Sequence, residues 1–252
     1  MMFDIEAVAA SFSGRLMLWL DSTDSTMLDA ARLAEGGVPS GSLIGAEEQT
    51  AGQGRHGHSW HSPTGTGLYF SQVLRLNLPA HETPIVTMAL GVAVAEAITQ
   101  ATGLAVDLRW PNDIMLNGRK AVGILVQQHN GALITGIGIN VNQESFPPDI
   151  GEIATSLRIA NGGRPVPREA LLLQLLPAID RMLEVLTGQG KDAILRLFSQ
   201  ASSYVSGRRV VVEQGDRQLR GTTDGMDENG FLMLREDNGT RTRILAGGVR
   251  PE

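Results

Sequence analysis

The sequence predicts an α+β fold, with a central mixed or antiparallel sheet, flanking helices and a small C-terminal β-barrel. Two Asn-Gly pairs, Asn117-Gly118 and Asn130-Gly131, each separate apolar runs, which is the strongest short-range signal of a β-hairpin. Helical patterns lie before and after these hairpins instead of alternating regularly with strands, which favours α+β over α/β. After Gly207 the chain changes to short alternating runs punctuated by Asn and Gly, typical of a small β unit.

The first part of the chain carries one helix pattern among three strand patterns. The segment "DSTMLDAARLAEGG" (24–37) has the spacing of a helix, with Ser25 or Thr26 as its N-cap and Gly36 near its end. One apolar run before this helix and one after it indicate strands, and a third strand is expected after the glycine-rich loop that follows. The expected strands cover 15–20, 42–49 and 67–76.

A long apolar helix follows. Thr83 and Pro84 open it, and it runs to about Ala101. Its apolar run "IVTMALGVAVAEAI" (85–98) is too short to span a bilayer and contains Glu96, so it predicts a buried helix. The elements expected after it are strands over 106–116, 119–128 and 132–140, a helix over 167–188 bent at Pro177, and a helix over 191–202.

Length and composition bound the kind of protein. The 252 residues suit a main domain over 1–205 and a small barrel over 206–252 that packs against it. A hydrophobic content of 42% supports a real core, and the net charge of −6 argues against broad nucleic-acid binding. The absence of cysteine excludes disulfides and zinc–thiolate sites, and the acidic N-terminus carries no export signal. We therefore expect a cytoplasmic protein that does not associate with membranes.

The densest stretch is "EEQTAGQGRHGHSWHSPTG" (47–65). Its glycines follow the spacing G-x-G-x-x-G, but Pro63 and Gly65 exclude the helix that a dinucleotide-binding fingerprint requires. No Gly-Lys-Ser/Thr follows, so it is not a P-loop either. The stretch is therefore a glycine-rich loop between two strands, whose backbone N–H groups are able to surround an anion.

Charged and aromatic groups gather in this loop and in the first hairpin. Arg55 offers a planar fork for a carboxylate or phosphate, Lys120 is a point charge after a tight turn, and Trp60 is able to stack on a flat ring. Asp113 suits a cation. The glycines at 123, 136 and 138 remove side chains from strand positions, which favours close approach to the backbone. Together these groups predict a cleft for two anions and one flat ring.

Each of these residues also has a purely structural interpretation. Ser25 and Thr26 would only cap a helix, Trp60 would be a core residue, Lys120 a solvated charge and Asp113 part of an Asx turn. The histidines at 56, 58 and 61 have a spacing that suits zinc, but they lie in a loop without a nearby acid or thiol. Weak anion contact or solvent exposure fits them better.

Four segments in combination resemble a known family. The segments "DSTMLDAARLA", "EEQTAGQGRHGHSW", "RWPNDIMLNGRKAVGIL" and "GIGIN" resemble those of biotin–protein ligases in order and spacing. Members of that family attach biotin to the biotin carboxyl carrier protein of acetyl-CoA carboxylase and related carboxylases. The resemblance implies that biotin's carboxylate attacks the α-phosphate of ATP, which gives biotinyl-5′-AMP, and that a carrier lysine then takes the biotin. It also implies that 1–205 is the biotin- and ATP-binding ligase domain.

The resemblance also implies roles for individual residues. Arg55, Lys120 and Asp113 would be catalytic, with Mg²⁺ held by the substrate phosphates and with Asp113 as its candidate protein ligand. The residues expected to bind biotin are Ser25, Thr26, Gln49, Gly52, Gln53, Gly54, Arg55, Lys120, Gly123, Leu125 and Gly136. The residues expected to bind ATP or AMP are Arg55, His56, His58, Trp60, Lys120, Asn140 and Arg250.

The sequence departs from the family pattern in several places. Met27 stands where the family usually has Asn, and Arg109 where it has Lys before W-P-N-D. Gln53, His56 and His58 replace some of the usual arginines, so Arg55 is the only permanent positive charge of the loop.

Other functions stay open at this point. A lipoate–protein ligase shares the fold and the adenylation chemistry, and a non-enzymatic biotin-binding module is a further alternative. Only about fifteen residues precede the first expected strand, whereas a helix-turn-helix domain needs roughly fifty, so we expect no DNA binding. An exposed edge of the central sheet would allow a homodimer.

Overall fold

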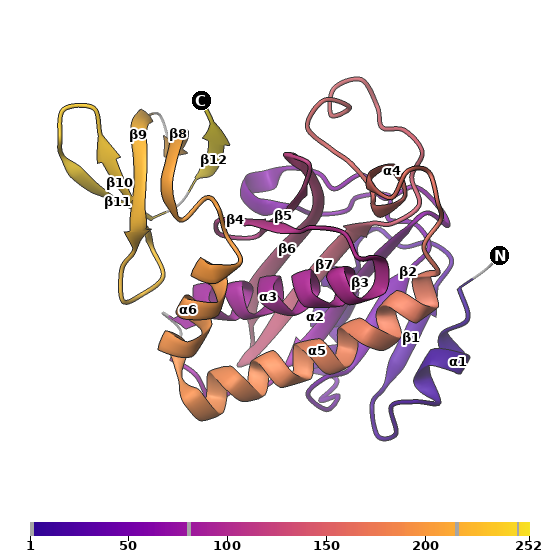
Figure 1. The fold of residues 1–252 in the computed structure, drawn as a ribbon. Helices are drawn as coiled ribbons and strands as arrows, with labels where there is room; N and C mark the ends of the chain where they lie inside the picture. The colour runs from indigo at the N-terminus through magenta and orange to yellow at the C-terminus, as the bar shows by residue number, and fades with distance from the viewer. Residues whose placement is uncertain (1–2, 80–81, 215–216, 246) are drawn as a thin grey trace.

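A computed structural model describes residues 3–79, 82–214, 217–245 and 247–252. A seven-stranded mixed sheet forms its centre, with the order β1-β2-β3-β7-β6-β5-β4 (Figure 1). β1 and β2 are parallel, and every other neighbouring pair is antiparallel. Its strands are β1 (Met17–Leu20), β2 (Leu43–Ala46), β3 (Gly67–Leu74), β4 (Asp107–Arg109), β5 (Asp113–Leu116), β6 (Arg119–His129) and β7 (Ala132–Asn140).

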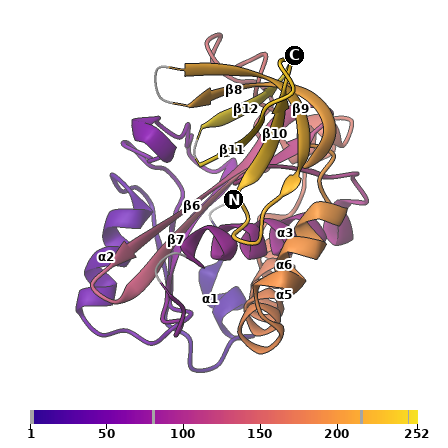
Figure 2. The same cartoon turned by 90° about the vertical axis from the view of Figure 1, so that its left-hand side faces the viewer.

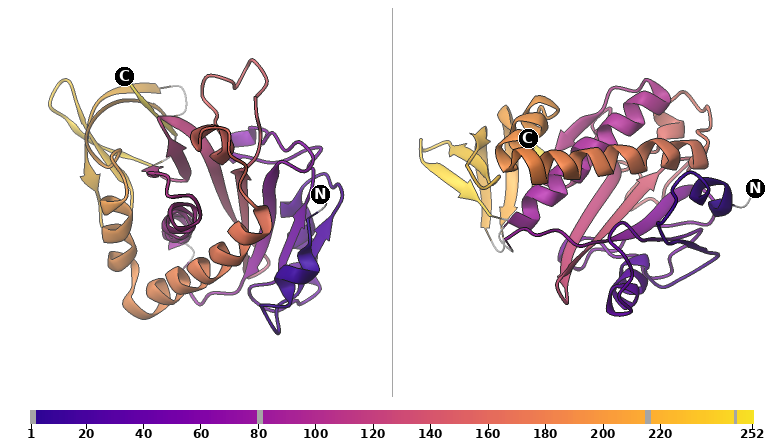
Figure 3. Two further views of the ribbon diagram at one scale, coloured as in Figure 1. Left: turned by 45° about the vertical axis from the view of Figure 1, so that its right-hand side comes forward. Right: turned by 90° about the horizontal axis from the view of Figure 1, so that it is seen from below.

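Helices cover both faces of this sheet. The right panel of Figure 3 shows α2 on one face and α3 with α5 on the other. α3 lies between the sheet and α5, and its buried side chains belong to the main hydrophobic core. The helices are α1 (Ile5–Ala9), α2 (Thr26–Glu35), α3 (Thr83–Thr102), α4 (Leu157–Ala160), α5 (Arg168–Gln189) and α6 (Lys191–Gln200), and a 3₁₀ turn, η1 (Arg55–Gly57), lies in the glycine-rich loop.

Both Asn-Gly hairpins are confirmed. Asn117 and Gly118 have φ values of 51° and 77°, and Asn130 and Gly131 have 47° and 78°. Two consecutive residues with positive φ are what a type I′ turn requires, which explains the Asn-Gly pairs. The turns fix the register of β5, β6 and β7, and so place Lys120 one residue into β6.

The single strand expected over 106–116 is wrong. β4 and β5 are instead two short strands that pair with each other, with Arg109 opposite Asp113, across a turn at Trp110–Pro111. Proline cannot donate to a strand ladder and restricts the residue before it, so the chain turns here. The turn places the side chains of Arg109 and Asp113 side by side.

α3 is longer than the apolar run from which it was predicted. Its 20 residues are long and apolar enough to cross a bilayer by length and composition alone, and it is the one such helix among the residues described. Its side chains, however, pack in the core of this fold. The prediction of a buried helix is confirmed.

α5 continues as one helix through Pro177.

The C-terminal part is a five-stranded antiparallel sheet with the order β11-β10-β9-β8-β12. Among the strands that the structure describes, β11 and β12 stay at its two edges, so the unit is a small open sheet and not a closed barrel. Figure 2 shows the strands of this unit gathered at one end of the molecule. Trp110 Nε1 donates to Gly230 O at 2.9 Å and ties the unit to the main sheet. Its strands are β8 (Ser206–Gln214), β9 (Arg217–Met226), β10 (Leu232–Glu236), β11 (Arg241–Ile244) and β12 (Gly248–Pro251).

Candidate active site

A pocket opens between the start of α2, the glycine-rich loop and the β6–β7 hairpin. It encloses about 440 Å³, counting the part open to solvent. Its walls combine bare backbone with a few polar and cationic side chains, as the sequence predicted for the cleft. It is lined by Thr26, Met27, Gln49, Gln53, Gly54, Arg55, Trp60, Phe70, Asn112, Lys120, Gly123, Ile124, Leu125, Gly136, Ile137 and Gly138.

The glycine-rich loop is a small hairpin. Trp60 N donates to Gly52 O at 2.8 Å, and Gly54 N donates to His58 O at 2.7 Å. His56 and Gly57 form its tip with φ values of 55° and 77°, a left-handed conformation that costs little at glycine. The base of the loop is therefore ordered by its own backbone bonds, and the exposed tip has few contacts.

Trp60 lies against the strands instead of pointing into solvent. A Cβ added to Gly138 would come within 2.5 Å of the Trp60 indole, and one added to Gly123 within 2.8 Å. The two glycines are therefore required for this packing. Lys120 Nζ lies 5.2 Å from the centre of the ring, within the range of a cation–π contact. The indole N–H is buried without a partner among the described residues, so a hydrogen-bond donor is free at the pocket.

The start of α2 is capped differently from the prediction. Ser25 occupies the N-cap position, but its side chain makes no capping hydrogen bond. Gln49 Oε1 instead accepts from Thr26 N at 2.9 Å and from Thr26 Oγ1 at 3.1 Å. A long-range contact has replaced the local cap, because the glycine-rich loop approaches the helix end. The contact joins two of the segments that carry the family resemblance.

Asp113 is the centre of a charged network. Lys120 Nζ lies 2.6 Å from its Oδ1, and Arg109 Nη2 lies 2.7 Å from its Oδ2. Burial alone would raise the pKa of the Asp113 carboxyl, but Lys120 and Arg109 outweigh it and hold that pKa below its usual value. Asp113 therefore stays ionised and fixes both cations. Lys120 is half-buried and paired, not a solvated charge.

Arg55 joins the loop to the first hairpin. Its Nη1 donates to Asn112 Oδ1 at 2.9 Å, and Asn112 Nδ2 donates to Ile124 O at 3.1 Å. Burial lowers the pKa of Arg55 and Asp113 partly offsets this, but a guanidinium stays protonated in proteins. Asn112 was not among the predicted site residues. Its place between Pro111 and Asp113 was the available signal, because an amide there is able to bridge two segments.

A second, larger groove continues from this pocket toward the C-terminal sheet. It encloses about 1190 Å³, counting the part open to solvent. The two spaces share Gly54, Arg55, Trp60, Asn112 and Lys120. Arg250 borders the far side, where its Nη2 lies 2.9 Å from Glu213 Oε2. Arg55 and Lys120 therefore lie at the boundary between a small pocket and a large groove.

Comparison with known proteins points to the same family as the sequence motifs do. Residues 19–144 match the biotin/lipoate A/B protein ligase family, and residues 205–249 match the biotin protein ligase C-terminal domain. The biotin--[acetyl-CoA-carboxylase] ligase of Mycobacterium tuberculosis is 31% identical over 251 residues, covering 96% of this chain and 91% of the relative. The chain belongs to the biotin protein ligase family.

Two further relatives agree with this family. The biotin protein ligase of Aquifex aeolicus, solved in complex with biotin and ATP, superposes with a TM-score of 0.83 at 31% identity, covering 94% of this chain and 99% of that one. The bifunctional ligase/repressor BirA of Bacillus spizizenii is 36% identical over 239 residues, covering 90% of this chain and 72% of the relative. The family and the fold expected from the sequence are confirmed.

The structure brings most of the predicted residues of this ligase family member together. Thr26, Gln49, Gln53 and the other pocket residues predicted for biotin meet there, whereas Ser25 is buried and does not line the pocket. Asn140 is also absent from both linings, and its side-chain amide donates to Thr155 O at 3.0 Å. Predicted residues outside the small pocket include Gly52, which lies at the loop base, and His56, His58 and Arg250, which border the larger groove.

Two metal sites were considered from the sequence: zinc at the loop histidines and Mg²⁺ at Asp113. The side chains favour neither. The three loop histidines do not form a metal-binding group with acids, and the described part of the chain holds no group of three or more His, Asp or Glu arranged to hold a metal ion. Both carboxylate oxygens of Asp113 already accept from Lys120 and Arg109. Asp113 therefore fits a positioning role better than the metal-ligand role expected for it.

Proposed function

We propose that this protein is an ATP-dependent biotin–protein ligase that forms biotinyl-5′-AMP and transfers biotin to a lysine of the biotin carboxyl carrier protein. One observation carries the proposal: Arg55 and Lys120 lie at the boundary shared by the pocket and the groove. Biotin in the small pocket would direct its carboxylate to this boundary, and ATP in the groove would bring its α-phosphate to the same place. The ligands of the Aquifex relative, biotin and ATP, are the same pair.

The first step joins two anions. A carboxylate oxygen of biotin attacks the α-phosphorus of ATP, and the bond to the departing pyrophosphate breaks. Arg55 and Lys120 reduce the repulsion between the reactants and stabilise the charge that develops on the phosphate. Asp113 holds the Lys120 ammonium in place, 2.6 Å from its own Oδ1. Mg²⁺, carried by the ATP phosphates, would neutralise part of their charge.

The second step uses an amine from the carrier. The carrier lysine attacks the acyl carbon of biotinyl-5′-AMP, and AMP leaves with the electrons of the broken C–O bond. Asp113 is a weak base because its pKa is held low. We therefore assign it the positioning of Lys120 and Arg109 and not proton removal from the incoming lysine.

The remaining residues have proposed binding roles. Thr26, Gln49, Gln53 and Gly54 surround the inner pocket with Gly123, Leu125 and Gly136, where biotin's ring and tail would lie. Ser25 and Gly52, which were also expected to bind biotin, lie outside the pocket lining. Trp60, His56, His58 and Arg250 border the groove and would contact the nucleotide, whereas Asn140 lies outside its lining. We also propose that residues 206–252 form a separate small domain. One hydrophobic core nevertheless includes buried side chains from both 1–205 and 206–252.

Carrier labelling tests the proposed function. We expect the purified protein to label a biotin carboxyl carrier domain in the presence of biotin, ATP and Mg²⁺, and to need all three. Streptavidin blotting of the carrier is the measurement. A lipoyl domain with lipoate serves as the matched comparison, and efficient lipoylation without biotinylation would assign the protein to the lipoate ligases. Biotin binding without adenylation would leave only a binding module.

We propose further that the protein acts in the cytoplasm and does not bind specific DNA. The net charge of −6 opposes the phosphate backbone, and binding would need a basic surface. A gel shift with the DNA upstream of biotin genes, at low salt and with biotin and ATP present, should show no complex. A tight, biotin-dependent shift would contradict this prediction.

The loop hairpin is expected to become more ordered when the adenylate forms. Its tip at His56 and Gly57 has few contacts, whereas its base is held by backbone bonds. Amide exchange should therefore slow at the tip when biotin and ATP are added, and change much less for Gly54 and Trp60. Equal tip protection with and without ligands would count against nucleotide contact by the loop.

A further inference from the structure

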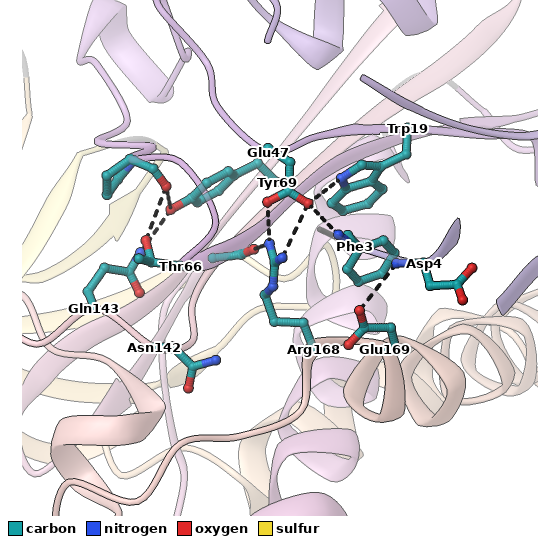
Figure 4. Close-up of polar contacts among 12 residues, drawn as sticks. Phe3, Asp4, Trp19, Glu47, Thr66, Tyr69, Asn142, Gln143, Arg168 and Glu169 are labelled. Atoms are coloured by element: carbon teal, nitrogen blue, oxygen red, sulfur yellow. Dashed lines mark hydrogen bonds and ion pairs between the residues drawn. The ribbon is translucent and has the colours of Figure 1, made fainter. Parts of the chain in front are cut away.

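A buried ion pair lies at the base of the glycine-rich loop, outside the pocket and the groove. Glu47 follows β2 directly, and Arg168 is the first residue of α5. Arg168 Nη1 lies 2.9 Å from Glu47 Oε2, and Nη2 lies 3.2 Å from Oε1. Their side chains are only 5% and 7% exposed. Figure 4 shows the guanidinium pointing at the carboxylate in this parallel, two-bond arrangement.

Arg168 also binds the other end of the loop. Its Nη1 donates to Gly67 O at 3.1 Å, at the start of β3. Gly65 N donates to Glu47 O at 3.2 Å, so the entry and exit of the loop are bonded to each other as well. One guanidinium therefore holds both ends of the segment that carries Gln49, Arg55 and Trp60.

The N-terminal segment completes the same cluster. Glu47 Oε1 accepts from Phe3 N at 3.0 Å and from Trp19 Nε1 at 3.1 Å. The rings of Phe3 and Trp19 stack with their centres 4.0 Å apart, and the Arg168 guanidinium carbon lies 5.3 Å from the Phe3 ring centre (Figure 4). Glu47 is thus held by donors from three separate parts of the chain.

We infer that Arg168 and Glu47 are positioning residues for adenylation: they fix the base of the glycine-rich loop so that Arg55 and Trp60 meet Lys120 at the site. Stability alone gives little reason to bury an ion pair, because desolvation offsets much of the attraction. A guanidinium gives something that an apolar pair cannot, namely a planar fork that binds a carboxylate and a carbonyl at once. The inference rests on the proposed function for its catalytic consequence, but its structural part is measurable without it.

The test compares Arg168→Lys with Arg15→Lys. Lysine keeps the charge at 168 but loses the planar fork, so the parallel two-bond contact with Glu47 is lost. Arg15 provides the matched control, since its Nη2 pairs with Asp180 Oδ2 at 2.7 Å and also ties the N-terminal segment to α5, but away from the loop. We expect Arg168→Lys to speed amide exchange across 49–62 and the release of biotinyl-5′-AMP each by about tenfold, the effect of roughly one hydrogen bond to a charged group.

Kinetics distinguish positioning from general weakening. Arg168→Lys should raise KM for biotin and ATP and lower the rate of pyrophosphate release, whereas Arg15→Lys should leave both unchanged. Equal loop exchange and equal kinetics in the two variants would overturn the inference. If neither wild type nor variants form the adenylate, the proposed function fails, while the exchange comparison still decides whether the pair holds the loop.

Two further measurements guard against a variant that does not fold. Glu47→Gln keeps the size and the acceptor oxygen but removes the charge, and it should give the same loop-specific exchange. In the unmodified protein, native-state exchange at low denaturant should show the loop base and the amides near Phe3 opening together as one unit. Independent opening of these two regions would overturn the inference without any variant.

Discussion

The Lys120→Ala variant should release pyrophosphate from ATP and biotin about 10²–10³ times more slowly than the unmodified protein, a loss of roughly 2.7–4 kcal/mol in the transition state. Lys120 lies at the boundary between pocket and groove, where the carboxylate and the phosphate would meet. Its charge matters most when the new bond forms, so the rate should fall more than the affinity for biotin.

The backbone at this position should survive the change. Lys120 N donates to Ile153 O at 2.8 Å, and Lys120 O accepts from Thr155 N at 2.9 Å, neither of which needs the side chain. Arg119→Ala is the matched control, because it removes an exposed cation from the neighbouring residue of the same hairpin. Full adenylation by Lys120→Ala, or an equal loss in Arg119→Ala, would show that the role assigned to Lys120 is wrong.

Local patterns were enough to predict much of the fold. Asn-Gly turns specify positive φ at two successive residues, so they define the β5–β6 and β6–β7 hairpins without any tertiary information. Thr83 and Pro84 likewise mark the start of α3. The turn at Trp110–Pro111 was missed although Pro111 marks it, because the apolar residues farther out on both sides, such as Leu108 and Ile114, continue a strand pattern. The turn is stabilised by contacts far away in the chain, such as the bond from Trp110 to Gly230.

The residues that form the site were easier to predict than the hydrogen bonds and ion pairs that join them. The resemblance to the biotin ligases brought Arg55, Lys120 and Asp113 together, and the structure confirms that they are neighbours. That Gln49 caps α2 was not predictable, because the two meet only after the loop folds over the helix. The pair of Glu47 and Arg168 is separated by 121 residues, and nothing in the local sequence marks either charge as buried.

The Arg55→Gly variant should fail in a different way, by releasing its intermediate. Arg55 links the loop to Asn112 through a bond of 2.9 Å, so it closes one side of the site. Without it, biotinyl-5′-AMP should still form, because Lys120 remains. The adenylate should dissociate roughly 10–100 times faster, which corresponds to the loss of a hydrogen bond to a charged group worth about 1.5–3 kcal/mol.

Escape of the adenylate has a visible consequence, because a free acyl-adenylate reacts with lysines on unrelated proteins. Arg55→Gly should therefore biotinylate an added bystander such as serum albumin, while its pyrophosphate release falls much less than that of Lys120→Ala. Thr64→Gly is the control: it adds the same flexibility to an exposed position of the loop without removing a cation. If both variants leak equally, loop flexibility and not the Arg55 contact retains the adenylate. If Arg55→Gly instead abolishes pyrophosphate release, Arg55 acts in the first step as strongly as Lys120.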